Sequence, residues 1–186
     1  LAGNACCGSG VGPKQIDEVI GIVKAYTTRV GAGPFPAELF DDVGEKIQEK
    51  GAEFGATTGR RRRCGWLDAV ILKNAVRLNG LTGLAVTKLD VLDGLESVEI
   101  CTAYEYQGKI INDFPASLDV LAKCQPVYET LPGWTEDTSK MRKLEDFPAN
   151  ARSYLDRMAE LAETELHIVS VGPDREQTIV LKHPYR

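Results

Sequence analysis

Apolar positions recur along the chain with two different periods, and this pattern predicts helices that alternate with short strands. Amphipathic helices are predicted at residues 14–29, 38–50, 67–78 and 149–164. In the first of these, Ile16, Val19, Ile20, Val23 and Tyr26 recur at helical spacing. Short apolar runs predict strands at residues 84–87, 98–106, 108–112, 125–131, 166–171 and 177–182. Alternation of helices with buried strands favours an α/β fold.

Glycine and proline separate these elements. Residues 8–13, 30–36 and 55–66 are loops by composition, because clustered Gly and Pro do not continue a helix. Asn79-Gly80 ends the predicted helix 67–78, and Gln107-Gly108 is the turn of a hairpin. No repeat or linker divides the 186 residues. We therefore expect one domain, or one large piece of a bigger domain.

Composition narrows the class of protein. Hydrophobic residues make up 43% and charged residues 26%, which is usual for a globular protein. The net charge of −5 argues against non-specific binding of nucleic acid, which needs a basic surface. No apolar run has the length of a membrane span, and no signal peptide is visible, so we expect a cytoplasmic protein without a membrane partner. The start at Leu1 is typical of the middle of a chain.

Cysteine and histidine spacing gives no zinc site. The five cysteines lack any C-x-x-C pair, and His167 and His183 lie far apart. We expect reduced, non-ligating thiols. Cys64 follows four arginines, which favour a thiolate, but a buried inert thiol is the preferred interpretation. His167 lies in an apolar strand, which favours a place in the core over a role as a general acid.

Two predicted strand ends carry residues suited to a guanine base. Thr87-Lys88-Leu89-Asp90 follows the strand at 84–87. A carboxylate there accepts from both the ring N–H and the exocyclic amine of guanine, while the lysine stem packs on the base. Ser170-Val171-Gly172-Pro173 follows another strand and offers a backbone N–H to the guanine O6. Neighbouring strand ends are where open α/β sheets bind ligands. Taken alone, Lys88 and Asp90 are equally typical of solvated loop charges.

Residues 55–63 combine glycines, two threonine hydroxyls and four arginines, which suits a mobile loop that closes on an anion. A solvated face and a nucleic-acid patch are the alternatives. Residues 30–33 are either a second loop that approaches a ligand closely or a plain helix stop. No Gly-x-x-x-x-Gly-Lys-Ser/Thr loop occurs, so the parts needed for phosphoryl transfer are absent from this sequence.

Taken together, these segments resemble the adenylosuccinate synthetases, and the resemblance spans essentially the whole chain. The motifs occur in the family's order: Ala25-Tyr26-Thr27-Thr28-Arg29-Val30-Gly31-Ala32-Gly33-Pro34-Phe35-Pro36, Gly55-Ala56-Thr57-Thr58-Gly59-Arg60 with Arg62, Gly65-Trp66-Leu67-Asp68, Thr87-Lys88-Leu89-Asp90-Val91-Leu92-Asp93, Pro126-Val127-Tyr128-Glu129, Leu131-Pro132-Gly133-Trp134 and Val169-Ser170-Val171-Gly172-Pro173-Asp174-Arg175.

The resemblance implies that residues 1–186 are the C-terminal part of a single P-loop-NTPase-like domain, a large, mostly parallel mixed sheet flanked by helices. It implies a homodimeric ligase that joins IMP to L-aspartate at the expense of GTP, through a 6-phosphoryl-IMP intermediate, on the route to AMP. The catalytic Asp and His and the ligands of Mg²⁺ would lie in the absent N-terminal half, so we expect no catalytic residue and no metal ligand here.

The resemblance also assigns binding residues. The loop that closes over aspartate and IMP would comprise Ala56, Thr57, Thr58, Gly59, Arg60, Arg61 and Arg62, with Val30 and Gly31 beside the IMP ribose. Arg60 would also reach that ribose. The GTP site would comprise Arg62, Lys88, Leu89, Asp90, Ser170, Val171 and Gly172. Two alternatives remain: a non-catalytic guanine-nucleotide-binding module, and an RNA-binding protein that uses the arginines. Net charge −5 disfavours the second.

Overall fold

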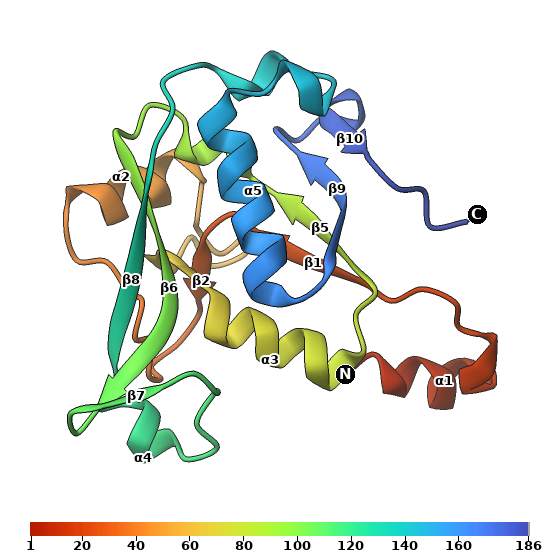
Figure 1. The fold of residues 1–186 in the computed structure, drawn as a ribbon, viewed down its shortest axis with the longest axis horizontal. Helices are drawn as coiled ribbons and strands as arrows, with labels where there is room; N and C mark the ends of the chain where they lie inside the picture. The colour runs from red at the N-terminus through yellow and green to blue at the C-terminus, as the bar shows by residue number, and fades with distance from the viewer. Residues whose placement is uncertain (186) are drawn as a thin grey trace.

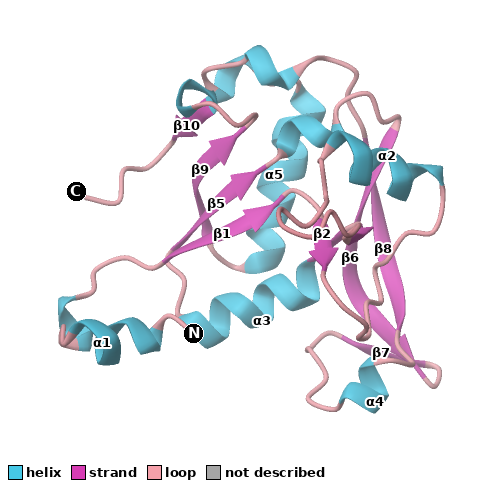
Figure 2. Cartoon of the chain, turned by 180° about the vertical axis from the view of Figure 1, so that it is seen from behind, coloured by secondary structure: helices cyan, strands magenta, loops and turns pink. Residues whose placement is uncertain are grey.

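The centre of the molecule is a mixed, mostly parallel sheet. The computed structural model describes residues 1–185. The sheet has the order β1 (Ile20–Lys24), β5 (Gly83–Thr87), β9 (Glu165–Ser170) and β10 (Thr178–Val180). Strands β1, β5 and β9 are parallel, and β10 runs antiparallel to β9. Helix α5 (Ala149–Ala162) lies in front of this sheet in Figure 1 and behind it in Figure 2, so it covers one face. The predicted α/β class is confirmed.

A second sheet packs beside the first. It contains β4 (Leu67–Asp68), β6 (Ser97–Tyr106), β7 (Lys109–Ile111) and β8 (Gln125–Pro132). The predicted hairpin is confirmed: β6 and β7 are antiparallel, and Gln107 and Gly108 have φ values of 51° and 75°. Positive φ at both turn positions is typical of a tight hairpin turn. The remaining elements are α1 (Gly3–Ser9), β2 (Thr27–Arg29), α2 (Asp42–Lys50), β3 (Arg63–Gly65), α3 (Ala69–Asn79), α4 (Leu118–Leu121) and short 3₁₀ turns.

The helix predicted at residues 14–29 is wrong. The segment forms a 3₁₀ turn, Pro13–Gln15, and then strands β1 and β2. β1 is paired along its whole length with β5, from Ile20 opposite Gly83 to Lys24 opposite Thr87. Branched Ile and Val suit a strand as well as a helix face, and pairing with the buried β5 decides between them. Helix α1, Gly3–Ser9, was also missed, since the sequence predicted no element before the loop at residues 8–13.

Two predicted helices begin later than expected, and in each case an aspartate caps the first turn. Helix α2 begins at Asp42, because the Asp41 side chain accepts from the Gly44 N–H. Helix α3 begins at Ala69, because Asp68 accepts from the Ile71 N–H while its backbone pairs with β6. Such caps satisfy N–H groups that have no partner inside the helix. The expected stop at Gly80 is confirmed by its φ of 60°.

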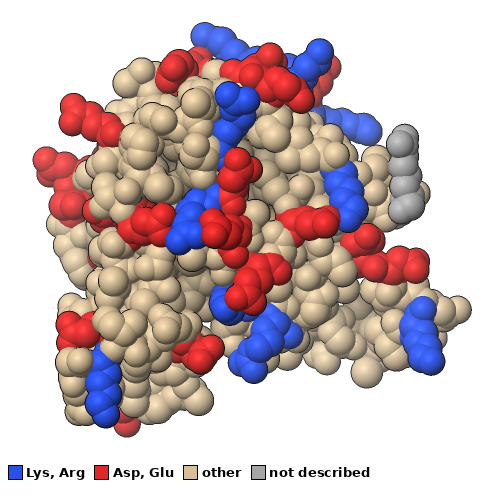
Figure 3. Space-filling model, viewed as in Figure 1, with Lys and Arg blue, Asp and Glu red and all other residues tan. Residues whose placement is uncertain are grey.

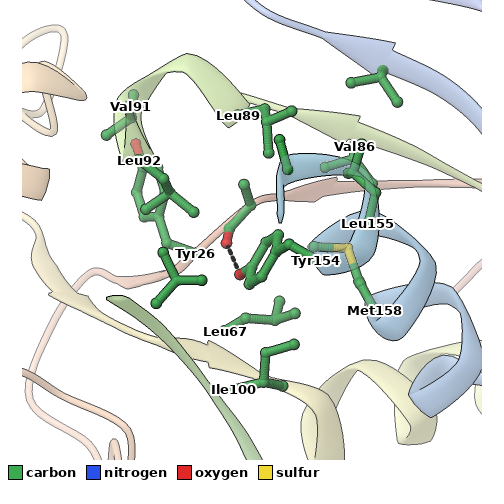
Figure 4. Close-up of a cluster of buried hydrophobic side chains, with 14 of the residues drawn as sticks. Tyr26, Leu67, Val86, Leu89, Val91, Leu92, Ile100, Tyr154, Leu155 and Met158 are labelled. Carbon is green, nitrogen blue, oxygen red and sulfur yellow. Dashed lines mark hydrogen bonds between the residues drawn. The ribbon is translucent and has the colours of Figure 1, made fainter. Parts of the chain in front are cut away.

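The core lies between the central sheet, α5 and the start of β6. Figure 4 shows Tyr154 and Met158 of α5 meeting Val86, Leu67 and Ile100 from three strands. The Tyr154 hydroxyl donates to the carbonyl of Ala25 at 2.5 Å, which satisfies the polar end of a fully buried ring. This core sets the carboxyl ends of β1 and β5 in place.

The outer surface carries both signs of charge. On the face drawn in Figure 3, acidic and basic side chains are interspersed and form no continuous basic stripe. Within residues 1–185, no helix combines the length and the apolar character needed to cross a bilayer.

Candidate functional site

The two predicted base-binding loops lie at the same edge of the central sheet. β5 and β9 are neighbouring parallel strands, with Val86 opposite Val169. Their carboxyl ends therefore point the same way, and residues 88–90 emerge beside residues 170–172. The expectation that these strand ends are adjacent is confirmed, and this is the edge at which open α/β sheets bind ligands.

Asp90 carries an unsatisfied buried acceptor. It lies in the first turn of the 3₁₀ helix Leu89–Leu92, and its Oδ1 atom has no hydrogen-bond partner within the described chain. Burial raises the pKa of Asp90 above its ordinary value. A buried acceptor without a donor is rare in folded proteins, so this oxygen is suited to a donor that arrives with a ligand. Asp90 borders a cavity of about 360 Å³ that is also lined by Lys50, Asp93, Gly94, Thr135, Asp137 and Ser139.

Asp93 lines the same cavity and was not singled out from the sequence. Its carboxylate accepts from the indole N–H of Trp134 at 2.5 Å and from the backbone N–H and hydroxyl of Thr138 at 2.8 and 3.0 Å. Burial raises the pKa of Asp93, and these hydrogen bonds act in the opposite direction. The sequence offered one indication of this role: Asp93 follows Asp90 by three positions, which is one helical turn. Its partner Trp134 gave no further indication by spacing.

A tight turn follows β9 at the same edge of the sheet as Asp90. The Ser170 hydroxyl donates to the Gly172 carbonyl at 2.9 Å, and the Val171 N–H donates to the Gln177 carbonyl at 3.0 Å. A Cβ on Gly172 would lie 2.2 Å from Gln177 Oε1, so only glycine fits there without a shift. Because the Val171 N–H is already used, the N–H left for a base in this turn is that of Gly172, which has no partner among residues 1–185.

The predicted anion loop is a compact turn between two paired residues. Phe54 and Arg61 form an isolated antiparallel bridge, and the Gly55 N–H donates to the Arg60 carbonyl at 2.8 Å. Gly59 has a φ of 63°, a conformation that a side chain would strain. The side chains of Thr57, Thr58, Arg60 and Arg61 are exposed, and Arg60 and Arg61 form no ion pair within the described chain. The loop therefore presents the Thr57 hydroxyl and the guanidinium groups of Arg60 and Arg61 to solvent, whereas the Thr58 hydroxyl accepts from the Arg60 N–H at 3.3 Å.

A buried carboxylate lies behind the loop. Glu53 is fully buried and accepts from Lys24 Nζ at 2.8 Å, the Tyr26 hydroxyl at 2.6 Å and Arg62 Nη1 at 3.0 Å. Lys88 Nζ lies 3.4 Å from the same carboxylate and donates to the carbonyl of Gly51. Burial acts to raise the pKa of Glu53, but hydrogen bonds from Lys24, Tyr26 and Arg62 outweigh it and lower the pKa to about 2. Glu53 is therefore ionised.

Arg63 connects the arginine segment to the loop at residues 30–36. It forms a two-pronged ion pair with Glu38, with Nε 2.7 Å from Oε1. Its Nη1 donates to the carbonyls of Gly31 and Gly33 at 3.1 and 2.7 Å. Gly31 has a φ of 85°, and Val30 beside it is 72% exposed. Residues 30–33 therefore form an anchored loop that turns Val30 outward, next to the arginine segment.

The family follows from comparison with known proteins. The sequence profile of the adenylosuccinate synthetases matches residues 1–179. The chain belongs to the adenylosuccinate synthetase family. The adenylosuccinate synthetases of Desulfatibacillum aliphaticivorans and Desulforapulum autotrophicum are 67% and 66% identical to it over 185 and 181 residues.

A solved structure agrees with this assignment. The fully ligated adenylosuccinate synthetase from Plasmodium falciparum superimposes with a TM-score of 0.92 at 38% identity, and the match covers 97% of this chain. The chain spans 43% of the length of the Desulfatibacillum and Plasmodium proteins. It therefore corresponds to less than half of a complete adenylosuccinate synthetase.

Within this member of the family, the predicted residues form two groups joined by Glu53. The base group surrounds Asp90, and the anion group lies on the loop that ends at Arg62. Leu89, which was assigned to the GTP site, has its side chain fully buried in the core, so only its backbone is available to a ligand. Glu53 was missed, because one acidic residue before a glycine-rich loop carries no distinguishing spacing.

Arg63 differs from Arg60 and Arg61 in the same run, because its side chain is held by contacts within the chain. Its side chain is 31% exposed, and all its polar contacts are to Glu38 and the 30–33 loop. Exposed arginines contribute little to stability, whereas hydrogen bonds that involve a charged group contribute more. The structure therefore assigns Arg63 an anchoring role.

Replacing Arg63 by leucine is expected to lower the free energy of unfolding by about 2 kcal/mol, because Glu38 loses its partner and two carbonyls lose a donor. Arg61→Leu is the matched control, since Arg61 is exposed and without an ion pair among residues 1–185, and it should change stability by less than about 0.5 kcal/mol. Urea unfolding of the two variants measures the difference. Equal midpoints would contradict the anchoring role.

Cys64 and His167 have the inert places expected of them. Cys64 is 4% exposed, and burial raises the pKa of its thiol to about 11. His167 is fully buried in β9. Within residues 1–185 no three His, Cys, Asp or Glu side chains are grouped so as to hold a metal ion.

Proposed function

We propose that this chain is the C-terminal part of a cytoplasmic, homodimeric enzyme that joins IMP to L-aspartate at the expense of GTP and forms adenylosuccinate. The observation that carries the proposal is the unpartnered Oδ1 of Asp90, which is buried beside the cavity at the shared edge of β5 and β9. A carboxylate in this place matches the two adjacent N–H donors of guanine, and adenine has no such pair. Membership of the family supports the reaction.

In this proposal the chain supplies residues that bind the substrates, and the residues that carry out phosphoryl transfer lie elsewhere in the enzyme. Asp90, with Lys88 and the turn at residues 170–172, binds the guanine base. Thr57, Thr58 and Arg60 bind aspartate, and Arg60 also reaches the IMP ribose beside Val30 and Gly31. Ala56, Gly59 and Arg61 belong to the closing loop, and Arg62 faces the GTP phosphates. Closure of the loop over three anionic reactants orients them and excludes water.

The remaining parts of the active site are assigned to the rest of the enzyme. Mg²⁺, which would neutralise phosphate charge, takes its ligands there. The exposed edge of the sheet supports this division. β1 is an edge strand within the described chain, and Ile22 on it is 81% exposed. Parallel strands are normally covered on both faces and paired on both sides.

The test uses the full-length protein that contains these residues. It is expected to form adenylosuccinate from IMP, GTP and aspartate and to reject ATP as the phosphoryl donor. Product formation is measured by absorbance and by chromatography. If the full-length protein binds GTP but forms no adenylosuccinate, the ligase assignment is wrong and the alternative, a non-catalytic guanine-nucleotide-binding module, is favoured.

The 186-residue chain by itself is expected to form no adenylosuccinate, because the sequence contains no phosphate-binding loop and no catalytic acid–base pair. The measurement is the same assay with the purified chain, and the full-length protein is the positive control. Product formed by the chain alone, confirmed by mass spectrometry, would contradict the assignment of the missing roles.

A further inference from the structure

We propose that Glu53 is a positioning residue that sets Arg62 and Lys88 relative to each other and so couples the anion loop to the base pocket. The inference rests on the proposed function and extends it to a residue between the two sites. Arg62 follows the loop at 55–60, whereas Lys88 begins the base-binding loop after β5. The two are distant in sequence, and Glu53 contacts both.

The backbone holds Glu53 from both sides. Its N–H donates to the carbonyl of Gln48 near the end of α2 at 2.8 Å, and its carbonyl accepts from the Arg62 N–H at 2.9 Å. The side chain is fully buried and takes hydrogen bonds at both oxygens. The carboxylate therefore has little freedom, and the cations bound to it are held at defined places.

The charges around Glu53 do not balance. Lys24, Arg62 and Lys88 surround a single carboxylate, which leaves a surplus of two positive charges (three minus one). The side chains of Arg62 and Lys88 are 33% and 38% exposed, so each is anchored at Glu53 and still partly open to a ligand. Stability alone is a weak reason for such a cluster, because a buried ion pair is commonly no more stable than an apolar replacement.

Both the backbone and the side chain of Lys88 are constrained. Its backbone has a φ of 62°, in the left-handed region, which turns the chain sharply after β5. Its amine donates to the carbonyl of Gly51, two residues before Glu53. A shift of the Glu53 segment therefore acts on Arg62 through an ion pair and a backbone hydrogen bond, and on Lys88 through an ion pair and the Gly51 carbonyl. Coupling of this kind is reciprocal, so a ligand at one site changes affinity at the other.

The test is Glu53→Gln in the full-length enzyme, which retains shape and hydrogen-bonding capacity but removes the charge. The KM values for GTP and for aspartate are both expected to rise about tenfold, within the usual range of coupling between sites. Glu53→Asp keeps the charge and should recover part of both losses. In an Arg62→Leu background, Glu53→Gln should have a smaller effect on the GTP KM than in the wild type, because one of its partners is already gone.

Tyr154→Phe is the control for a purely structural role. It removes a buried hydrogen bond to the carbonyl of Ala25 and leaves every side-chain partner of Glu53 in place. It should lower the melting temperature and leave both KM values unchanged. If Tyr154→Phe raises both KM values as much as Glu53→Gln does, the positioning role is wrong and the effect is one of general stability.

A second readout needs no turnover. Arg60 and Arg61 are exposed, so trypsin is expected to cleave the loop there. Calorimetric titration measures the binding of GDP to each protein. Bound GDP is expected to slow tryptic cleavage of the loop in the wild type and not in Glu53→Gln. Equal protection of both proteins at saturating GDP would overturn the coupling. Absence of adenylosuccinate formation by a wild type that still shows GDP-dependent protection would overturn the proposed function and leave the coupling intact.

Discussion

Arg60→Leu in the full-length enzyme is expected to raise the KM for aspartate and to lower kcat. Arg60 lies on the loop between the paired residues Phe54 and Arg61, is exposed and is free of ion pairs among residues 1–185. It is therefore available to a ligand at no cost in broken contacts. Removing one partner of a charge pair in a closed site costs about 2–5 kcal/mol, which corresponds to a loss in kcat/KM of about 30-fold to several thousand-fold.

The matched control for Arg60→Leu is Arg61→Leu, because the neighbouring arginine has the same exposure and charge. Arg61→Leu should change kcat/KM by much less, since that residue is not assigned a direct contact with aspartate. Arg63→Leu is unsuitable as a neutral control, because Arg63 anchors Glu38 and the 30–33 loop.

The alternatives predict different results for this arginine series. A solvated face predicts mild and interchangeable effects of Arg60→Leu, Arg61→Leu and Arg62→Leu. A nucleic-acid patch predicts a graded loss of RNA binding with unchanged aspartate kinetics. Aspartate KM and kcat, measured for the three variants beside an RNA titration, separate these outcomes. Small and equal changes would defeat the anion-loop assignment.

Asp90→Asn is expected to weaken GTP and to favour xanthosine triphosphate. The amide places a donor where guanine also has a donor, and the loss is about 1–3 kcal/mol for each charge-assisted hydrogen bond. Xanthine has a carbonyl in place of the exocyclic amine, so it accepts from the new amide. The measurement is the ratio of kcat/KM for the two nucleotides in wild type and variant.

Asp93→Asn serves as the comparison for Asp90→Asn. Asp93 lines the same cavity, but its oxygens are occupied by Trp134 and Thr138. Asp93→Asn should disturb the wall of the cavity and weaken the binding of both nucleotides alike, so that the ratio of their kcat/KM values stays unchanged. If Asp90→Asn leaves the GTP KM unchanged, or Asp93→Asn alters the ratio equally, Asp90 does not read the base.

Several features of this protein were determined by the sequence alone, because their cause is local. The strand at 84–87 is a short apolar run, and the hairpin after Tyr106 needs only two residues that accept positive φ. Helix α5 follows from its apolar stripe. The adjacency of residues 88–90 and 170–172 also followed, because parallel strands place their carboxyl ends at one edge.

Tertiary structure decided the rest. Residues 14–29 carry a helical period, yet Ile20–Lys24 is a strand, because hydrogen bonds to β5 outweigh a weak local preference. Arg63 and Arg60 look alike in a run of four arginines, and only the position of Glu38 makes one an anchor and leaves the other free. Glu53 has no motif at all. Its importance arises because Lys24 and Lys88, which are distant from it in the sequence, contact its buried carboxylate in the folded chain. Burial and pairing of this kind depend on the whole fold, so no local pattern of residues encodes them.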